Sequence, residues 1–187
     1  MDSSQKFAPT TKITHQLLPV WNAESQTLLL GTIPSPKSRE AGFYYMHPQN
    51  RFWKVLFSVF GEELLHPNST LKNATQTELE SAIHERQDFL LCHKIALWDV
   101  LQSCEISGAA DNTIKNAVPN DFTTLFTKSK ISRVFCTGKK AFALWQKYCA
   151  PLYKNQFNLH ASCLPSTSPA NAAISLESLI KAYQVIK

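Results

Sequence analysis

The residues best suited to binding a planar ligand are concentrated in one segment, residues 31–53 (GTIPSPKSREAGFYYMHPQNRFW). Three consecutive aromatic residues, Phe43, Tyr44 and Tyr45, occur there in a stretch without helical or strand periodicity. An aromatic ring can stack on a planar ligand while neighbouring polar groups hydrogen-bond the ligand's edge. The same rings could instead fill the core beneath a long structured loop. The pattern alone therefore leaves two interpretations open, a ligand platform and a buried plug.

Two polar side chains follow the aromatic residues. His47 could donate a hydrogen bond to a ligand, although a His-Pro pair ahead of a helix can equally be structural. Asn50 carries an amide that can both accept and donate hydrogen bonds. It also stands where a helix N-cap would stand, and capping and catalysis do not exclude each other. Both residues are therefore candidates whose role the sequence leaves open.

Further candidates follow other apolar runs of the chain. Asp99 ends KIALWDV, where its carboxylate could face a ligand or cap the next turn. The segment LPSTSPANAAIS (164–175) places Ser and Pro residues ahead of a predicted helix, and hydroxyls and backbone N–H groups at a helix start bind phosphate well. Lys139 and Lys140 open another predicted helix, where they could hold a second phosphate or be solvated.

The elements that must position these residues alternate between strands and helices. Short apolar runs predict strands over 27–32, 94–100, 132–138 and 157–164. Helical spacing predicts helices over 52–60, 77–91 (with Thr77 as N-cap), 120–128, 139–149 and 176–183. Such alternation favours a three-layer α/β/α sandwich around a short, mainly parallel four-stranded sheet. Ligands bind outside the carboxyl ends of such strands, so we expect residues 31–35, 99–103, 137–140 and 164–171 to form one site.

The composition limits the class of protein. The chain has 187 residues, 44% of them hydrophobic, which favours one domain over 1–187 with about the first 15 residues as a loose arm. Its net charge of +5 suits a polyanionic partner without requiring one. The five cysteines are an odd number without a CxxC pair, so we expect reduced thiols and neither a metal nor another cofactor. No apolar run has membrane-spanning length, so we expect a soluble, cytoplasmic protein that does not bind membranes.

Four motifs resemble those of the hypoxanthine-DNA (deoxyinosine) glycosylases, a branch of the uracil-DNA glycosylase superfamily. They are GTIPS (31–35), YYMHPQNRFW (44–53), LWDV (97–100) and LPSTSPA (164–170). The chain is also similar, less closely, to the mismatch-specific uracil/thymine-DNA glycosylases. The similarity spans residues 18–186. Because a long block and further motifs occur in the family's order, the resemblance is specific.

The resemblance implies a role for each candidate. It assigns catalysis to Asn50. Asp99, in the LWDV motif, is the second catalytic candidate, because a carboxylate at that strand end could accept from a purine N–H or help stabilise the sugar cation. Tyr45 matches the aromatic residue that stacks on the flipped base, with Tyr44 as pocket wall. The remaining base-binding positions are Gly31, Ile33, Ser35 and His47. The positions that grip the DNA backbone are Pro165, Ser166, Ser168, Pro169 and Asn171, to which Lys139 and Lys140 could add phosphate contacts.

One position departs from the pattern of the uracil-excising relatives. Those enzymes hold the attacking water with Asn or Asp at the position of Ile33, which has no hydrogen-bonding group. The resemblance to the deoxyinosine branch implies Asn50 as the substitute, since its amide can accept from a water. The departure therefore favours hypoxanthine over uracil as the base that is released.

The expected function is that of a monofunctional DNA glycosylase in base excision repair. It would hydrolyse the N-glycosidic bond of a deaminated or mispaired base in double-stranded DNA and leave an abasic site. We expect a monomer. Two alternatives stay open: a G:U/G:T mismatch-specific uracil/thymine-DNA glycosylase, and a non-catalytic DNA-binding protein on the same scaffold.

Overall fold

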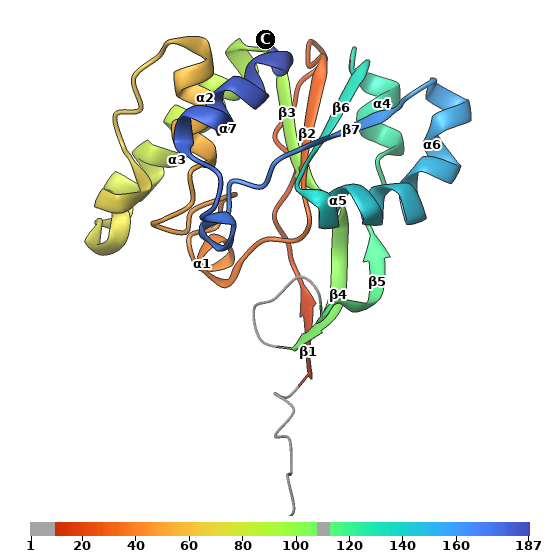
Figure 1. The fold of residues 1–187 in the computed structure, drawn as a ribbon, viewed down its shortest axis with the longest axis horizontal. Coiled ribbons are helices and arrows are strands. Elements are labelled where there is room, and N and C mark those ends of the chain that lie inside the picture. The colour runs from red at the N-terminus through yellow and green to blue at the C-terminus, as the bar shows by residue number, and fades with distance from the viewer. Residues whose placement is uncertain (1–9, 108–112) are drawn as a thin grey trace, which may run out of the picture.

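The central sheet has four parallel strands in the order β3-β2-β6-β7 (Figure 1). The computed structural model describes residues 10–107 and 113–187. The strands are β2 (Thr27–Gly31), β3 (Ile95–Asp99), β6 (Arg133–Thr137) and β7 (Ala161–Leu164). All five residues of β2 are buried, as is usual for a parallel strand covered on both faces. The predicted four-stranded parallel sheet is confirmed.

Helices cover both faces of this sheet (Figure 1). One layer contains α2 (Phe52–Phe60), α3 (Gln76–Cys92) and α7 (Leu176–Tyr183), and the other contains α4 (Thr123–Lys128), α5 (Lys139–Leu144) and α6 (Ala150–Phe157). Side chains along a strand alternate between the layers: Leu29 packs with the first, whereas Leu28 and Leu30 pack with the second. The predicted α/β/α sandwich is confirmed. Within the described residues, none of the helices is long and apolar enough to cross a membrane.

Several predicted boundaries were wrong. The helix expected to start at Asn120 or Asp121 begins at Thr123, with Phe122 as its N-cap. Helix α3 is capped by Thr75 instead of Thr77, because the Thr75 side chain accepts from the Glu78 N–H while the Glu78 side chain accepts from the Thr75 N–H. The last strand begins at Ala161 and not at residue 157. A helical run continues from α5 through residues 145–149 into α6, and ends only where Asn158 takes a left-handed φ of 52°.

A second, antiparallel sheet projects from the sandwich and was not predicted (Figure 1). Its strands are β1 (Thr10–Thr14), β4 (Leu101–Ser107) and β5 (Lys115–Pro119), in the order β1-β4-β5. The expectation of a loose arm was wrong for residues 10–14, which pair with β4. The rest of that expectation falls on residues 1–9, which lie outside the described residues. The expected loop over 99–103 is also wrong, because β4 begins at Leu101. Strand β1 is mostly exposed, so it lacks the alternation of apolar and polar residues by which a half-buried strand is recognised in a sequence.

Candidate active site

The carboxyl ends of the parallel strands open into a cleft of about 1440 Å³. The helix α1 (Pro36–Glu40) and the loops after β2 and β7 form much of its wall. From the projecting sheet, Thr11, Ile13 and Ile106 also line the cleft, which the sequence did not indicate. Every predicted site residue except Lys140 lines it: Gly31, Ile33, Ser35, Tyr44, Tyr45, His47, Asn50, Asp99, Lys139, Pro165, Ser166, Ser168, Pro169 and Asn171.

Asp99 lies directly against Gly31 at the base of the cleft. The two residues end neighbouring strands and are register partners. A Cβ atom on Gly31 would lie 2.2 Å from Asp99 Oδ1 and 2.7 Å from the Tyr45 hydroxyl oxygen. Position 31 therefore requires glycine, because a buried carboxylate and a phenol occupy the space that a side chain would take.

Tyr45 forms a fixed aromatic surface in the cleft. Its ring stacks on Phe52 with centroids 3.7 Å apart and an interplanar angle of 12°. Its hydroxyl lies 2.8 Å from Thr137 Oγ1, which itself donates to the Leu30 carbonyl at 3.1 Å. Because the Thr137 proton is used on Leu30, Tyr45 is the donor to Thr137. Burial, and then the charge of Asp99, raise the pKa of Tyr45 well above its usual value, so the phenol stays neutral.

Tyr44 belongs mainly to the core, although it touches the cleft. Its hydroxyl is shared between the carbonyls of Leu17 and Leu18, at 3.1 and 3.0 Å. Burial, followed by the charge of Asp99, raises the pKa of Tyr44 as well. Each of the two interpretations of the aromatic segment therefore holds for one residue: Tyr44 fills the core, and Tyr45 lines the site.

Asn50 is held by its carbonyl oxygen. Oδ1 accepts from the Phe52 N–H and from the Thr167 hydroxyl, each at 3.0 Å. An amide oxygen has two lone pairs, and these two donors use both. No acceptor for Asn50 Nδ2 lies among residues 10–107 and 113–187, so its two N–H groups are what Asn50 can offer to a ligand in the cleft. The bond from the Phe52 N–H ties Asn50 to the first residue of α2. The expectation that Asn50 is the N-cap was wrong, because the N-cap is Arg51, which has no side-chain cap bond.

The loop after β7 is tied to the body of the protein through backbone carbonyls. Arg51 donates from Nη2 to the carbonyls of Ser168 and Asn171, at 3.4 and 2.9 Å. Tyr183 donates its hydroxyl to the Pro165 carbonyl at 2.9 Å. Because these bonds fix the backbone, the loop can present its side chains to a bound strand in a defined arrangement.

Two serine hydroxyls of this loop accept backbone N–H groups: Ser166 Oγ from Ser168 and Ser168 Oγ from Ala170, both at 3.3 Å. A hydroxyl that accepts can still donate its proton, which is the interaction a phosphate needs. The helix predicted directly after segment 164–175 is confirmed, since α7 begins at Leu176 with Ser175 as its cap. A short 3-10 turn, Pro169–Asn171, lies within the segment before it.

Charged groups at the cleft were only partly predicted. Lys139 lines the cleft and Lys140 does not. Lys37 and Arg39, which sequence reasoning missed, also line it; Arg39 Nη1 donates to the Pro34 carbonyl at 2.7 Å. His47 Nδ1 accepts from the Gln49 N–H at 3.2 Å, which leaves Nε2 as the ring nitrogen that can donate to a ligand.

Two threonines that bond predicted site residues were missed from the sequence. Thr137 and Thr167 both lie inside loops expected at the site, but nothing in their spacing distinguishes them from neighbouring hydroxyl residues. Only their contacts in the folded structure identify them. Thr137 bonds Tyr45, and Thr167 bonds Asn50, across large sequence separations.

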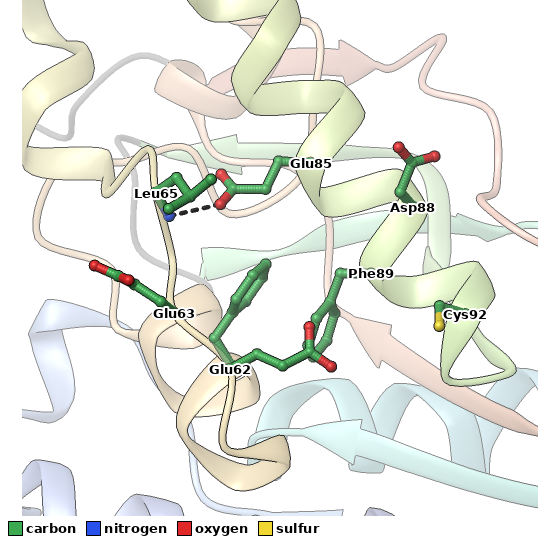
Figure 2. A pocket seen from close by; sticks show the side chains of 8 residues that line it. Glu62, Glu63, Leu65, Glu85, Asp88, Phe89 and Cys92 are labelled. Carbon is green, nitrogen blue, oxygen red and sulfur yellow. Dashed lines mark hydrogen bonds between the residues drawn. The ribbon is translucent and has the colours of Figure 1, made fainter.

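A second hollow, of about 360 Å³, lies between the end of α2 and α3 and shares no lining residue with the cleft (Figure 2). Carboxylates surround it, among them Glu62, Glu63 and Asp88. In the described part of the chain, no three His, Cys, Asp or Glu side chains are grouped so that they could hold a metal ion. Glu85 accepts the Leu65 N–H at 2.6 Å, so at least this carboxylate has a structural use (Figure 2).

Comparison with known proteins defines the class. The sequence profile of the Uracil DNA glycosylase superfamily matches residues 18–186, and the chain belongs to this superfamily. The resemblance inferred from the motifs is therefore confirmed.

Two relatives specify the branch. The chain is similar to a hypoxanthine DNA glycosylase of Methanosarcina barkeri, with 33% identity over 124 residues that cover 66% of this chain and 70% of the relative. It is also similar to a hypoxanthine DNA glycosylase of Methanosarcina acetivorans, with 30% identity over 157 residues, or 83% and 87% of the two chains. The NMR structure of a candidate uracil DNA glycosylase from M. acetivorans has the same fold, with a TM-score of 0.64, 24% identity, and coverage of 94% of this chain and 99% of that one.

Proposed function

We propose that this chain is a DNA glycosylase that hydrolyses the N-glycosidic bond of deaminated bases in double-stranded DNA, with hypoxanthine favoured. The family and the two hypoxanthine DNA glycosylase relatives support this function. The observation that carries it is the convergence of three groups in one cleft: the stacked ring of Tyr45, the buried carboxylate of Asp99 and the oriented amide of Asn50.

The first step is capture of the damaged nucleotide outside the helix. Flipping a base costs a few kcal/mol, least at a mispair, which favours deaminated bases over normal ones. Stacking on an aromatic ring contributes roughly 1–3 kcal/mol of binding free energy per base. Tyr45 can supply this, because its ring is already fixed against Phe52 and lines the cleft.

Bond cleavage leaves an electron pair on the departing base and positive charge on the sugar. Groups that stabilise both charges in a fixed arrangement lower the barrier. Asp99 offers negative charge, and Asn50 offers N–H groups. With its oxygen already used by Phe52 and Thr167, Asn50 acts as a donor, either to the carbonyl oxygen of the leaving base or to a lone pair of the attacking water. This replaces the expectation that Asn50 accepts from the water.

Substrate preference follows from Ile33. Its side chain lines the cleft without any hydrogen-bonding group, where uracil-excising relatives hold the water. We therefore favour hypoxanthine over uracil, with a G:U/G:T mismatch-specific uracil/thymine glycosylase as the second candidate. Family membership disfavours a non-catalytic DNA-binding protein.

DNA contact is assigned to the loop after β7 and to the basic residues beside it. Pro165, Ser166, Ser168, Pro169 and Asn171 line the cleft next to Lys139. Hydroxyls can donate to phosphate oxygens, and the net charge of +5 favours a polyanion. We further propose that the protein acts as a monomer and needs neither a metal nor another cofactor.

The test is direct detection of the products. A duplex with one inosine is incubated with excess protein, and free hypoxanthine is measured by chromatography. We expect free base and a strand that breaks only after alkali treatment. Strand cleavage without alkali contradicts monofunctional hydrolysis. Tight DNA binding without release from inosine, uracil, xanthine or mispaired thymine duplexes indicates the non-catalytic alternative.

A further inference from the structure

The backbone that carries Tyr45 is held in a conformation that non-glycine residues rarely adopt. Tyr45 has a φ of 56°, in the left-handed region, where a Cβ is unfavourable. Its carbonyl accepts from Asn68 Nδ2 at 2.7 Å, and the same amide nitrogen donates to the His47 carbonyl at 3.0 Å. One buried amide thus holds the chain on both sides of Met46.

Asn68 is itself fixed by a buried arginine of α3. Arg86 Nη2 donates to Asn68 Oδ1 at 2.9 Å and to the His66 carbonyl at 2.7 Å, while Nη1 donates to the Ala82 carbonyl at 2.6 Å. The Arg86 side chain is completely buried, and its guanidinium carbon lies 5.4 Å from the centre of the Trp53 ring. Such a group can hold the amide of Asn68 in a single orientation.

The neighbouring Glu85 fixes the same segment from outside. It accepts the N–H groups of Leu65 and His66 at 2.6 and 3.2 Å, the first of which is visible in Figure 2. Its Oε2 lies 3.6 Å from Arg86 Nη1. Burial lowers the pKa of Arg86 to about 10, which leaves the guanidinium charged at neutral pH and its hydrogen bonds charge-assisted. The segment 65–68 is therefore anchored to α3.

A third contact completes the support. Trp53 donates its indole N–H to the Tyr44 carbonyl at 2.9 Å. Side chains from α2 and from the anchored segment thus hold the carbonyls of residues 44, 45 and 47, whereas the ring of Tyr45 is fixed by Phe52 and Thr137. The backbone and the ring of Tyr45 have separate supports.

We propose that Asn68, oriented by Arg86, is a positioning residue for base capture: its two donated hydrogen bonds set the backbone of Tyr45 and so the plane of the ring that receives the flipped base. This inference rests on the proposed function. Asn68 does not line the cleft, so it acts only through Tyr45. Neither the family motifs nor the sequence pattern around residue 68 indicated this role.

The decisive variant is Asn68→Asp. A carboxylate keeps an acceptor for Arg86 but has no N–H, so the anchoring to α3 is retained while both bonds to the Tyr45 segment are lost. We expect the single-turnover rate on an inosine duplex to fall roughly 10- to 100-fold, as for other small misplacements of a reacting group. Asn73→Asp, at an exposed position of the same 3-10 turn (Asn68–Asn73), is the matched control and should retain the wild-type rate.

A double-mutant cycle with Tyr45→Ala separates positioning from general loosening. If Asn68 acts through the ring, Asn68→Asp slows the wild-type protein but adds little in the Tyr45→Ala background. If the fold-losses in rate of the two single variants multiply in the double variant, the two residues act independently and the inference is overturned. If Asn68→Asp does not fold, as judged by thermal unfolding, Asn68→Ser is carried through the same cycle. A wild-type protein inactive on inosine would defeat the proposed function, whereas an active wild type and an equally active, folded Asn68→Asp would defeat this inference alone.

Discussion

Thr167 donates a hydrogen bond to Asn50 across 117 positions of sequence, with 3.0 Å between Thr167 Oγ1 and Asn50 Oδ1. The bond joins the loop that we assign to DNA contact with the residue that we assign to catalysis. The Phe52 N–H occupies the other lone pair of Oδ1, so the amide of Asn50 has one orientation. Displacement of the Thr167 loop would therefore also displace the amide.

Removal of the Thr167 hydroxyl should slow catalysis more than it weakens binding. Thr167→Val keeps the shape of a buried side chain but loses the donor to Asn50. We expect a roughly tenfold lower single-turnover rate, about 1.4 kcal/mol of barrier, with little change in duplex affinity. Thr167→Ser retains a hydroxyl and serves as the control. A valine variant as fast as wild type would show that the bond does not orient Asn50.

Substitutions of Asn50 distinguish a donor from an acceptor. Asn50→Ala should lower the single-turnover rate on hypoxanthine by roughly two to three orders of magnitude, about 3–4 kcal/mol. Asn50→Asp keeps the acceptor for the Phe52 N–H at the start of α2, a hydrogen bond worth about 1 kcal/mol of stability. It has no N–H, and we expect it to be as slow as the alanine variant. Substantial activity in Asn50→Asp would mean that the residue accepts from the water instead.

The sequence could predict where the site lies, because loops after parallel strands meet at one edge of the sheet. Its motifs also identified Asn50, Tyr45 and Asp99 as residues of that site. Neither pattern could predict the bonds from Thr167 and Asn68, since pairing between side chains distant in sequence leaves no local periodicity. The projecting sheet escaped prediction for a related reason: β1 and β5 are largely exposed and are defined by backbone pairing with β4.

Enlarging Gly31 should disable the site by displacing Asp99. A Cβ at this position would lie 2.2 Å from Asp99 Oδ1, a separation that requires the carboxylate to move. We expect Gly31→Ala to lose roughly two orders of magnitude in rate and about 1–3 kcal/mol of stability. Asp99→Asn, which removes the charge without the steric conflict, should show a comparable loss of rate. Full activity in Gly31→Ala would mean that this placement of Asp99 is not needed for catalysis.

The loop after β7 should contribute to DNA affinity without contributing charge. Affinity for an abasic-site duplex should decrease steeply with salt, since phosphate contacts release counterions. The Ser166→Ala/Ser168→Ala double variant should bind several-fold more weakly with an unchanged salt slope, because serine is uncharged. Ser162→Ala, at an exposed position of β7, is the control. Equal affinity of the double variant and the wild type, both folded by thermal unfolding, would remove this loop from the DNA interface.

The central claim is that this cleft releases deaminated bases with hypoxanthine favoured, since Ile33 lines it where uracil-excising relatives hold the water. The most direct measurement compares single-turnover release of hypoxanthine and of uracil from duplexes that differ only in the target base. We predict faster release of hypoxanthine. Uracil release that is as fast or faster would contradict the assignment to the hypoxanthine branch, while leaving membership of the superfamily intact.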